Sequence, residues 1–345
     1  MRISDFDYEL PEELIAQAPL ARRDGSRMLI VDRASQTWHD TRFTDLPKYF
    51  RANDALVLNN TRVFPARLHG QRSPSGGAVE ILLLREVKPN VWQTLIRPAR
   101  RLQTGARIAF ANSKLIAEVV ESLDDGLRLI KFESEEPFER IIDELGDTPL
   151  PPYIKREQGE TADDRERYQT VYASERGAIA APTAGLHFTP QTLATIEECG
   201  VQVVPVTLHV GYGTFEPVRV DELDQHAVAP EWFSVNDEAA QSINRARANA
   251  GRIVAVGTTT ARALESATGS EGQVRAGQGW ADLTIVPGYS FRAVDVLLTN
   301  FHLPRSSLLF LVSAFAGREL VLAAYRHAVR EGYRFYSYGD CMLVV

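Results

Sequence analysis

The stretch Ile253-Val-Ala-Val-Gly-Thr-Thr-Thr-Ala-Arg262 decides the fold of most of this chain. Its apolar start predicts a buried strand over 252–256, the glycine and threonines predict a tight loop, and 259–266 has the pattern of a helix. The neighbouring segments repeat this order. They comprise a helix that starts at Thr189-Pro190 and stops at Gly200, strands at 201–206 and 294–299, a helix at 237–250, and one or two helices over 307–330. Repeated strand, loop and helix units predict a layered α/β domain with ligands held near strand ends.

A second pattern follows the short apolar strand predicted at 54–59. It consists of brief strand-like runs separated by Gly-rich or charged turns, with no helical spacing, at 65–72, 78–84, 91–96, 107–110, 115–120 and 127–132. Such a series predicts a small antiparallel β-barrel. Helical spacing resumes at 137–145, and the proline-rich run 148–153 forms a stiff connector. We therefore predict an α/β domain made of residues 1–61 and 149–345, with residues 62–148 inserted as the barrel.

Charge separates the two parts. The whole chain of 345 residues has a net charge of −7, yet twelve basic and six acidic residues lie between Arg62 and Lys131. A basic module inside an acidic protein is typical of phosphate contacts that position a nucleic acid. A solvated strand surface that happens to use arginine explains the same charge.

Composition also limits the compartment and the redox chemistry. No apolar stretch approaches membrane-spanning length, and the first residues lack the apolar block of a secretion signal, so we expect a cytoplasmic protein without a membrane partner. Cys199 and Cys341 are the only cysteines, which is too few for a disulfide scaffold, and we interpret both as buried thiols.

Several catalytic motifs are missing from the sequence. It contains no phosphate-binding Gly-x-x-x-x-Gly-Lys-Ser/Thr loop, no Gly-x-Ser-x-Gly elbow and no His-Glu-x-x-His pair. Gly211-Tyr-Gly213 continues as Thr-Phe-Glu and so lacks the third glycine of a dinucleotide fingerprint. Nucleoside triphosphate hydrolysis, serine esterase chemistry and zinc proteolysis are therefore disfavoured.

The remaining candidates lie in loops at predicted strand ends. Gly257-Thr-Thr-Thr-Ala-Arg262 offers free amides and hydroxyls to a carboxylate, phosphate or ribose, although an ordinary capped turn explains the same letters. His187, His209 and His302 occur in Gly- or Pro-containing loops, and imidazole titrates near neutral pH. Asp340 is either an acid/base group or a turn residue. The histidines lack the close spacing of a metal motif, so we predict no metal.

Nine motifs in order along the chain carry a resemblance to a known family. They are Ile15-Ala-Gln-Ala-Pro-Leu-Ala-Arg-Arg-Asp-Gly-Ser-Arg27, Leu58-Asn-Asn-Thr-Arg-Val-Phe-Pro-Ala-Arg-Leu68, Leu150-Pro-Pro-Tyr-Ile-Lys155, Arg167-Tyr-Gln-Thr-Val-Tyr-Ala173, Ala181-Pro-Thr-Ala-Gly-Leu-His-Phe-Thr189, His209-Val-Gly-Tyr-Gly-Thr-Phe215, Val256-Gly-Thr-Thr-Thr-Ala-Arg262, Thr299-Asn-Phe-His-Leu-Pro-Arg-Ser-Ser307 and Tyr338-Gly-Asp340. In these the chain resembles the S-adenosylmethionine:tRNA ribosyltransferase-isomerase family of queuosine biosynthesis over essentially its whole length.

The resemblance implies a reaction and a fold. The ribosyl part of S-adenosylmethionine is transferred and rearranged onto 7-aminomethyl-7-deazaguanine in the tRNA anticodon, giving epoxyqueuosine, adenine and methionine. S-adenosylmethionine is then a cosubstrate, and no cofactor is permanently bound. The family fold is similar to the predicted one, an α/β domain with an inserted small β-barrel. We expect a monomer.

The reaction suggests roles for the candidate residues. A base is needed beside the sulfonium and a proton or hydrogen-bond donor at the departing adenine, so His187 or His209 is expected to transfer protons, with His302 and Asp340 as further candidates. The residues expected to hold S-adenosylmethionine are Gly211, Gly213, Thr214, Gly257, Thr258, Thr259 and Arg262. Arg262 is expected to pair either with the carboxylate of this cosubstrate or with Glu265 or another acid in a structural bridge.

The basic barrel is expected to bind tRNA phosphates. The arginines assigned to these contacts are Arg62, Arg67, Arg97, Arg100 and Arg101. Two other functions stay open at this point. An S-adenosylmethionine-dependent RNA methyltransferase would use the same cosubstrate, and a noncatalytic RNA-binding protein would use the same arginines but not the histidine-bearing loops.

Overall fold

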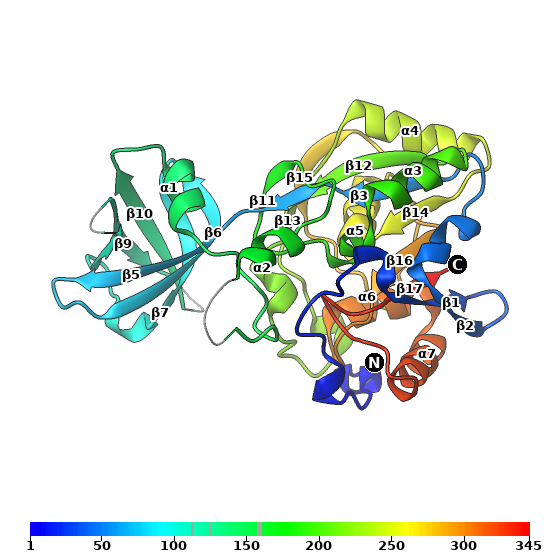
Figure 1. Cartoon of the computed structure of the whole chain (residues 1–345), viewed down its shortest axis with the longest axis horizontal. Helices are drawn as coiled ribbons and strands as arrows, with labels where there is room; N and C mark the ends of the chain where they lie inside the picture. Colours follow the sequence, from blue (N-terminus) through cyan, green and yellow to red (C-terminus); the bar gives the residue numbers. More distant parts are fainter. Residues whose placement is uncertain (112–113, 124–125, 157–160) are drawn as a thin grey trace.

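The computed structural model describes residues 1–345 except 112–113, 124–125 and 157–160. It has two parts, a small β-barrel and a larger lobe built on one mixed sheet, which lie side by side along the long axis (Figure 1). This confirms the predicted fold class, an α/β layer combined with a small antiparallel barrel.

The sheet of the larger lobe has nine strands in the described residues, in the order β15-β13-β12-β3-β14-β16-β17-β1-β2. Strands β12, β3, β14 and β16 run parallel at its centre, and every residue of β3, β14 and β16 is buried. Near-continuous apolar sequence suits these strands because both of their faces are covered. The bounds are β1 (Arg27–Asp32), β2 (Thr37–Arg42), β3 (Ala55–Asn59), β12 (Gln202–Leu208), β13 (Glu231–Val235), β14 (Ile253–Val256), β15 (Gly277–Ala281), β16 (Val296–Asn300) and β17 (Cys341–Val344).

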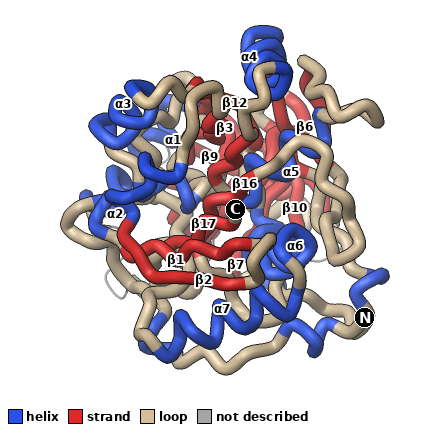
Figure 2. Tube along the Cα trace, turned by 90° about the vertical axis from the view of Figure 1, so that its right-hand side faces the viewer, coloured by secondary structure: helices blue, strands red, loops and turns tan. Residues whose placement is uncertain are grey.

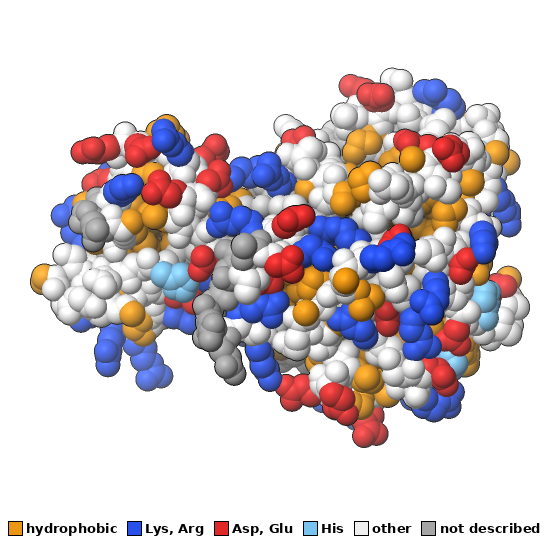
Figure 3. All heavy atoms as spheres, viewed as in Figure 1, with side chains coloured by type: hydrophobic (Ala, Val, Ile, Leu, Met, Phe, Trp, Pro, Cys, Tyr) orange, Lys and Arg blue, Asp and Glu red, His pale blue; other side chains and the backbone are white. Residues whose placement is uncertain are grey.

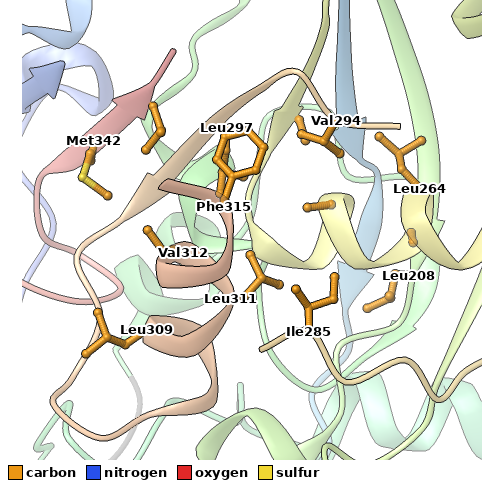
Figure 4. Close-up of a cluster of buried hydrophobic side chains, with 14 of the residues drawn as sticks. Leu208, Leu264, Ile285, Val294, Leu297, Leu309, Leu311, Val312, Phe315 and Met342 are labelled. Carbon is orange, nitrogen blue, oxygen red and sulfur yellow. The ribbon is translucent and has the colours of Figure 1, made fainter. Parts of the chain in front are cut away.

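Helices cover both faces of this sheet. Alternate strand residues point to opposite faces, so Val254 and Val256 join a core with α3, while Ile253 and Ala255 join the larger core with α4, α5, α6 and α7. In Figure 2 strands β16 and β17 lie between α3 and α6. Figure 4 shows Leu297 of β16 beside Phe315 of α6 in the larger core. The helices are α3 (Pro190–Glu198), α4 (Asp237–Ala248), α5 (Thr258–Ala267), α6 (Ser307–Ala316) and α7 (Arg318–Arg330).

Local signals set the start of α3 as predicted. The Thr189 hydroxyl accepts a hydrogen bond from the Thr192 amide at 3.1 Å, with Pro190 at the first helical position of α3. The segment 307–330 forms two helices because Gly317, at φ 89°, breaks it between α6 and α7. No single helix in the described ranges is long and apolar enough to cross a membrane; α6 and α7 reach that length only as a pair bent by 116°.

The barrel is closed by six strands in the order β10-β7-β6-β5-β8-β9 and has its own apolar core. All six strands predicted from the sequence are present. Gly70 is required in β5 because a Cβ atom there would lie 2.7 Å from the Phe110 ring. The bounds are β5 (Arg67–Ser73), β6 (Ala78–Lys88), β7 (Val91–Arg97), β8 (Arg107–Phe110), β9 (Leu115–Ser122) and β10 (Leu127–Ser134).

Short elements join the two parts. The chain leaves β3 through β4 (Thr61–Val63), which pairs in parallel with β11 (Glu175–Ala178). It returns from the barrel through α1 (Phe138–Leu145) and α2 (Ala162–Arg167). The barrel strands lie inside the predicted insertion 62–148, and the exact domain limits stay a prediction.

One prediction about the cysteines is wrong. Cys341 is buried, but Cys199 is exposed. Cys199 is the last residue before the Gly200 turn that ends α3, and helix ends of this kind face solvent even when the preceding turn packs on a sheet.

Candidate active site at the carboxyl edge of the sheet

The predicted site loops meet at one edge of the large sheet. The parallel strands β3, β12, β14 and β16 all end there, at Asn59, Leu208, Val256 and Asn300. Strand β17 runs antiparallel to β16, so its start, next to Asp340, lies at the same edge. Loops at the carboxyl ends of parallel strands are the usual place for a ligand site in an α/β fold.

Several cavities lie at this edge, and three of them form a row. The first, the helix cavity, has a volume of about 350 Å³ and is bounded by α5, the start of α6 and the loop after β12. The second, the central cavity, has about 40 Å³ and lies between the loops that follow β14 and β16. The third, the inter-lobe cleft, has about 500 Å³ and is bounded by β5, β6 and β7 of the barrel and by the connector 147–156.

The three cavities follow one another in space. Thr258, Thr259 and Tyr336 line both the helix cavity and the central cavity. On its other side the central cavity adjoins the inter-lobe cleft. Ala180 lines the central cavity, and the preceding residue, Ile179, lines the cleft. The central cavity therefore lies between a cavity of cosubstrate size and a cleft that reaches the barrel.

The loop after β14 is built as the sequence predicted. Gly257 has φ 89°, a value that favours glycine, and is the N-cap of α5. Its amide donates to the Leu298 carbonyl at 2.7 Å, which fixes the loop against β16. Thr258 and Thr259 follow in the first helical turn and face the two adjoining cavities.

Arg262 makes a structural bridge, although it also lines the helix cavity. Its Nη1 lies 2.6 Å from Oε2 of Glu231, and both side chains are only 7% exposed. Three further hydrogen bonds run from this guanidinium to the carbonyls of Leu283, Ala229 and Ala281. Of the alternatives predicted for Arg262, the bridge to another acid is present. The acid is Glu231, because Glu265 instead accepts backbone hydrogen bonds from 292–294.

The loop after β12 lines all three cavities. Val210 lines the central cavity, Tyr212 the inter-lobe cleft and Gly213 the helix cavity. The Gly211 amide donates to Oε1 of Glu231 at 2.8 Å. The Thr214 side chain, also predicted to bind the cosubstrate, lies outside the described part of the structure.

His209 is held between two partners at the start of this loop. Its Nδ1 lies 2.7 Å from the Thr61 hydroxyl, and its ring stacks on Trp232 at 4.9 Å. Burial lowers the pKa of His209, and the charge of Glu175 opposes that change. A Cβ atom on Gly177 would lie 2.5 Å from Nε2, so glycine is needed there to admit the ring.

His302 and His187 are both buried. His302 lines the central cavity, with Nε2 3.2 Å from the Thr299 hydroxyl and Nδ1 3.3 Å from the Tyr325 hydroxyl. Burial lowers its pKa to about 3 and that of His187 to about 4. His187 lines a smaller side cavity, where Nδ1 lies 2.9 Å from the Ser26 hydroxyl. Both rings are therefore neutral at pH 7.

Asp340 has a structural environment. Its two carboxylate oxygens each accept a backbone hydrogen bond at 2.8 Å, from Arg27 and from Arg334. Burial raises the pKa of Asp340. These bonds join the start of β1 to the turn before β17, so Asp340 has the role of a turn residue, which was one of its two predicted alternatives. The acid/base role stays a prediction.

The five arginines predicted to bind tRNA lie on or next to the barrel, and two of them enter the cleft. Arg67 and Arg97 line the inter-lobe cleft together with Lys155 and Arg156. Arg100 and Arg101 follow in the exposed turn η5 (Ala99–Arg101), and Arg62 is exposed on β4. Figure 3 shows Lys and Arg side chains gathered along the junction of the barrel and the larger lobe.

Arg128, another basic residue of the barrel segment, is buried. Its guanidinium donates to the carbonyls of Leu102, Leu127 and Ala99, at 3.3, 2.8 and 3.3 Å. It therefore supports the turn that carries Arg100 and Arg101.

Sequence reasoning missed three polar residues of the site. Glu231 joins the loop after β12 to helix α5, and Tyr168 and Asn300 line the central cavity. The side chains of Tyr168 and Asn300 are both buried. The only sequence signal was the position of Asn300, directly after an apolar strand. In the part of the chain that the structure describes, no group of three His, Cys, Asp or Glu side chains is placed to hold a metal ion.

Comparison with known proteins gives consistent matches over the full chain. A family model described as queuosine biosynthesis protein matches residues 3–344. An S-adenosylmethionine:tRNA ribosyltransferase-isomerase from Symbiobacterium thermophilum is 51% identical over 345 residues, which is 100% of each chain. The crystal structure of an S-adenosylmethionine tRNA ribosyltransferase from Thermotoga maritima matches with a TM-score of 0.56 and 36% identity, over 99% of this chain and 100% of that one.

Proposed function

The chain belongs to the queuosine biosynthesis protein family, and we propose on that premise that it is an S-adenosylmethionine:tRNA ribosyltransferase-isomerase. It transfers and isomerises the ribosyl group of S-adenosylmethionine onto 7-aminomethyl-7-deazaguanine in the tRNA anticodon. The products are epoxyqueuosine in the tRNA, adenine and methionine. Neither rival function, a methyltransferase or a noncatalytic RNA-binding protein, is favoured by a specific observation.

The observation that carries the proposal is the row of three cavities. S-adenosylmethionine is assigned to the helix cavity, whose volume of about 350 Å³ suits a cosubstrate of this size. The anticodon nucleotide is assigned to the inter-lobe cleft, where Arg67 and Arg97 supply positive charge. Unstacking a base from an anticodon loop costs less than extracting it from a duplex, so the base can reach this cleft.

Chemistry is then expected in the central cavity, where the two substrates meet. The Tyr168 hydroxyl and the Asn300 side-chain amide on its wall are buried polar groups that can hydrogen-bond a substrate. The positive sulfonium acidifies the adjacent ribose C5′ hydrogens, and the departing adenine needs a proton or a hydrogen-bond donor.

The three candidate histidines differ in their access to this cavity. His302 lines it directly, and its neutral ring can hydrogen-bond a substrate but is a weak base because its pKa is about 3. His209 directly precedes Val210, which lines the cavity, and it keeps its role as a candidate for proton transfer. His187 lines the side cavity, which adjoins the central cavity through Ser337.

Product analysis tests the function. Purified protein is incubated with S-adenosylmethionine and tRNA that carries 7-aminomethyl-7-deazaguanine, and every released small molecule is identified. Adenine and methionine are expected. Release of S-adenosylhomocysteine would instead identify a methyltransferase, and no release at all would support RNA binding alone.

Substitution of the histidines tests the site. His187→Ala, His209→Ala and His302→Gln are compared with the wild type under saturating substrates. Proton transfer by a positioned side chain contributes roughly 100-fold or more, so loss of the acting residue should lower kcat by that factor. Normal turnover in both His187→Ala and His209→Ala would remove those two residues from the mechanism.

A monomeric state and a cytoplasmic location remain predictions. Light scattering can test the monomeric state.

A further inference from the structure

The Glu231 carboxylate joins the loop after β12 to helix α5, and both elements bound the helix cavity. Glu231 is the first residue of β13, and its two oxygens contact different elements. Oε1 accepts from the Gly211 amide in the loop after β12 at 2.8 Å, and Oε2 contacts Arg262 of α5 at 2.6 Å. Gly211 and Arg262 are 51 residues apart in sequence, so no local turn holds the loop and the helix together.

The loop held by Glu231 has an unusual position. Within four residues it contributes Val210 to the central cavity, Tyr212 to the inter-lobe cleft and Gly213 to the helix cavity. A displacement at Gly211 would therefore move walls of all three. The other end of the bridge is equally fixed, because Arg262 also donates to three backbone carbonyls.

We infer that Glu231 is a positioning residue of the active site, which sets the distance between the loop 210–213 and helix α5 and thereby the fit of both substrates. The inference rests on the proposed function. It assigns Glu231 no contact with a reacting atom, since its carboxylate is engaged with Gly211 and Arg262. Misplacement of a site by about 1 Å costs roughly 100-fold in rate, so a bridge of this kind is expected to matter.

A matched control exists at the opposite edge of the sheet. Asp54 precedes β3 and contacts Arg252 at 2.7 Å, and it also accepts from the Arg51 and Arg252 amides at 2.9 and 2.8 Å. The Asp54 side chain is 1% exposed. Like Glu231, it is a buried carboxylate bound to one arginine and to backbone. It lies at the amino ends of β3 and β14, about five residues or 16 Å from the carboxyl edge.

The test compares Glu231→Gln with Asp54→Asn. Both variants lose the charge of a buried ion pair, so both should melt at a lower temperature than the wild type. Only Glu231→Gln should raise the Kd for S-adenosylmethionine, by roughly tenfold or more, together with the KM for the substrate tRNA. Equilibrium binding of S-adenosylmethionine makes the first measurement independent of turnover.

A second variant covers the case in which Glu231→Gln does not fold. Glu231→Asp keeps the charge beside Arg262 but is one methylene shorter, so it cannot reach both partners, and the same rise in Kd is expected. Binding equal to that of the wild type in whichever Glu231 variants fold, or an equal rise in Asp54→Asn, would overturn the inference. A wild-type protein that releases neither adenine nor methionine would instead refute the proposed function, so the two failures are distinct.

Discussion

Asn59 and Leu208 exchange two hydrogen bonds across the carboxyl edge of the sheet. Nδ2 of Asn59 donates to the Leu208 carbonyl at 2.9 Å, and the Leu208 amide donates to Oδ1 of Asn59 at 3.0 Å. The amide of Thr61 donates to the same Oδ1 at 3.1 Å. The Asn59 side chain thus continues the β3–β12 ladder beyond its last residue pair and sets where the loop with His209 begins.

Asn59→Ala should therefore be strongly destabilising. It removes the Asn59 partner of three buried backbone groups, namely the amide and carbonyl of Leu208 and the amide of Thr61. Each such group costs about 1–3 kcal/mol, so we expect a loss of at least about 3 kcal/mol in the free energy of unfolding. Urea denaturation measures the free energy of unfolding of the variant and of the wild type. Asn60→Ala is the control, because Asn60 loses only one side-chain bond, from Thr207, and about 1 kcal/mol is expected there. Equal losses in the two variants would contradict this account.

Gly177→Ala should displace the His209 ring. The added methyl would lie 2.5 Å from Nε2, and the ring cannot retreat easily because it stacks on Trp232. We expect kcat to fall at least tenfold if His209 acts in proton transfer. Gly77→Ala in the barrel is the control, since no atom lies within 4 Å of a Cβ there. A fully active Gly177→Ala protein would argue that His209 is not catalytic.

Stability should fall as the pH is lowered from about 6.5 to 4. Burial lowers the pKa of His302 to about 3 and that of His187 to about 4. The unfolded chain protonates these rings near pH 6.5, so it binds more protons than the folded state in this window, and each histidine contributes up to about 1.4 kcal/mol per pH unit. His302→Gln should flatten the dependence of the unfolding free energy on pH. An equal slope in the wild-type protein and in His302→Gln would refute the assignment.

Neutralising the barrel arginines should weaken tRNA binding in a salt-dependent way. Each lost phosphate contact lowers the slope of log K against log salt concentration by about 0.7–0.9. An Arg97→Ala/Arg100→Ala/Arg101→Ala protein should therefore show a slope that is shallower by about two to three. The control replaces Lys48 and Arg51, which are exposed at the opposite edge of the sheet. An unchanged slope in the triple variant would count against the placement of tRNA on the barrel.

The two cysteines should differ in reactivity. Cys199 is exposed, whereas Cys341 is fully buried and burial raises the pKa of its thiol. Because the thiolate is the reactive form, a thiol reagent should label one cysteine in the native protein and two after denaturation. The Cys199→Ser protein should show no native labelling, and rapid native labelling of this variant would contradict the burial of Cys341.

Much of the fold was predictable because its signals are local. Continuous apolar runs marked β3, β14 and β16, alternation marked the barrel strands, and Thr189-Pro190 marked the start of α3. The sequence also predicted that His302, Gly257 and the loop after His209 lie close together, because the carboxyl ends of parallel strands share one edge of the sheet. The functional family was predictable from nine motifs in order.

Individual roles within the site were not predictable. Arg262 could equally have paired with a substrate, with Glu265 or with another acid, and the pairing with Glu231 arises because β13 lies beside β12. Asp340 looked like an acid/base candidate, yet both of its oxygens bind backbone amides. Three similar histidine loops gave three different environments, and only His302 faces the central cavity.

The sequence by itself thus determined the elements, the two-part architecture and the family, since periodicity, caps and ordered motifs are written along the chain. Only the tertiary structure decided which side chains have partners, which are buried and which line a cavity. Those properties depend on the order of strands across the sheet, and strand order places residues such as Glu231 and Gly211 in contact although they are twenty positions apart.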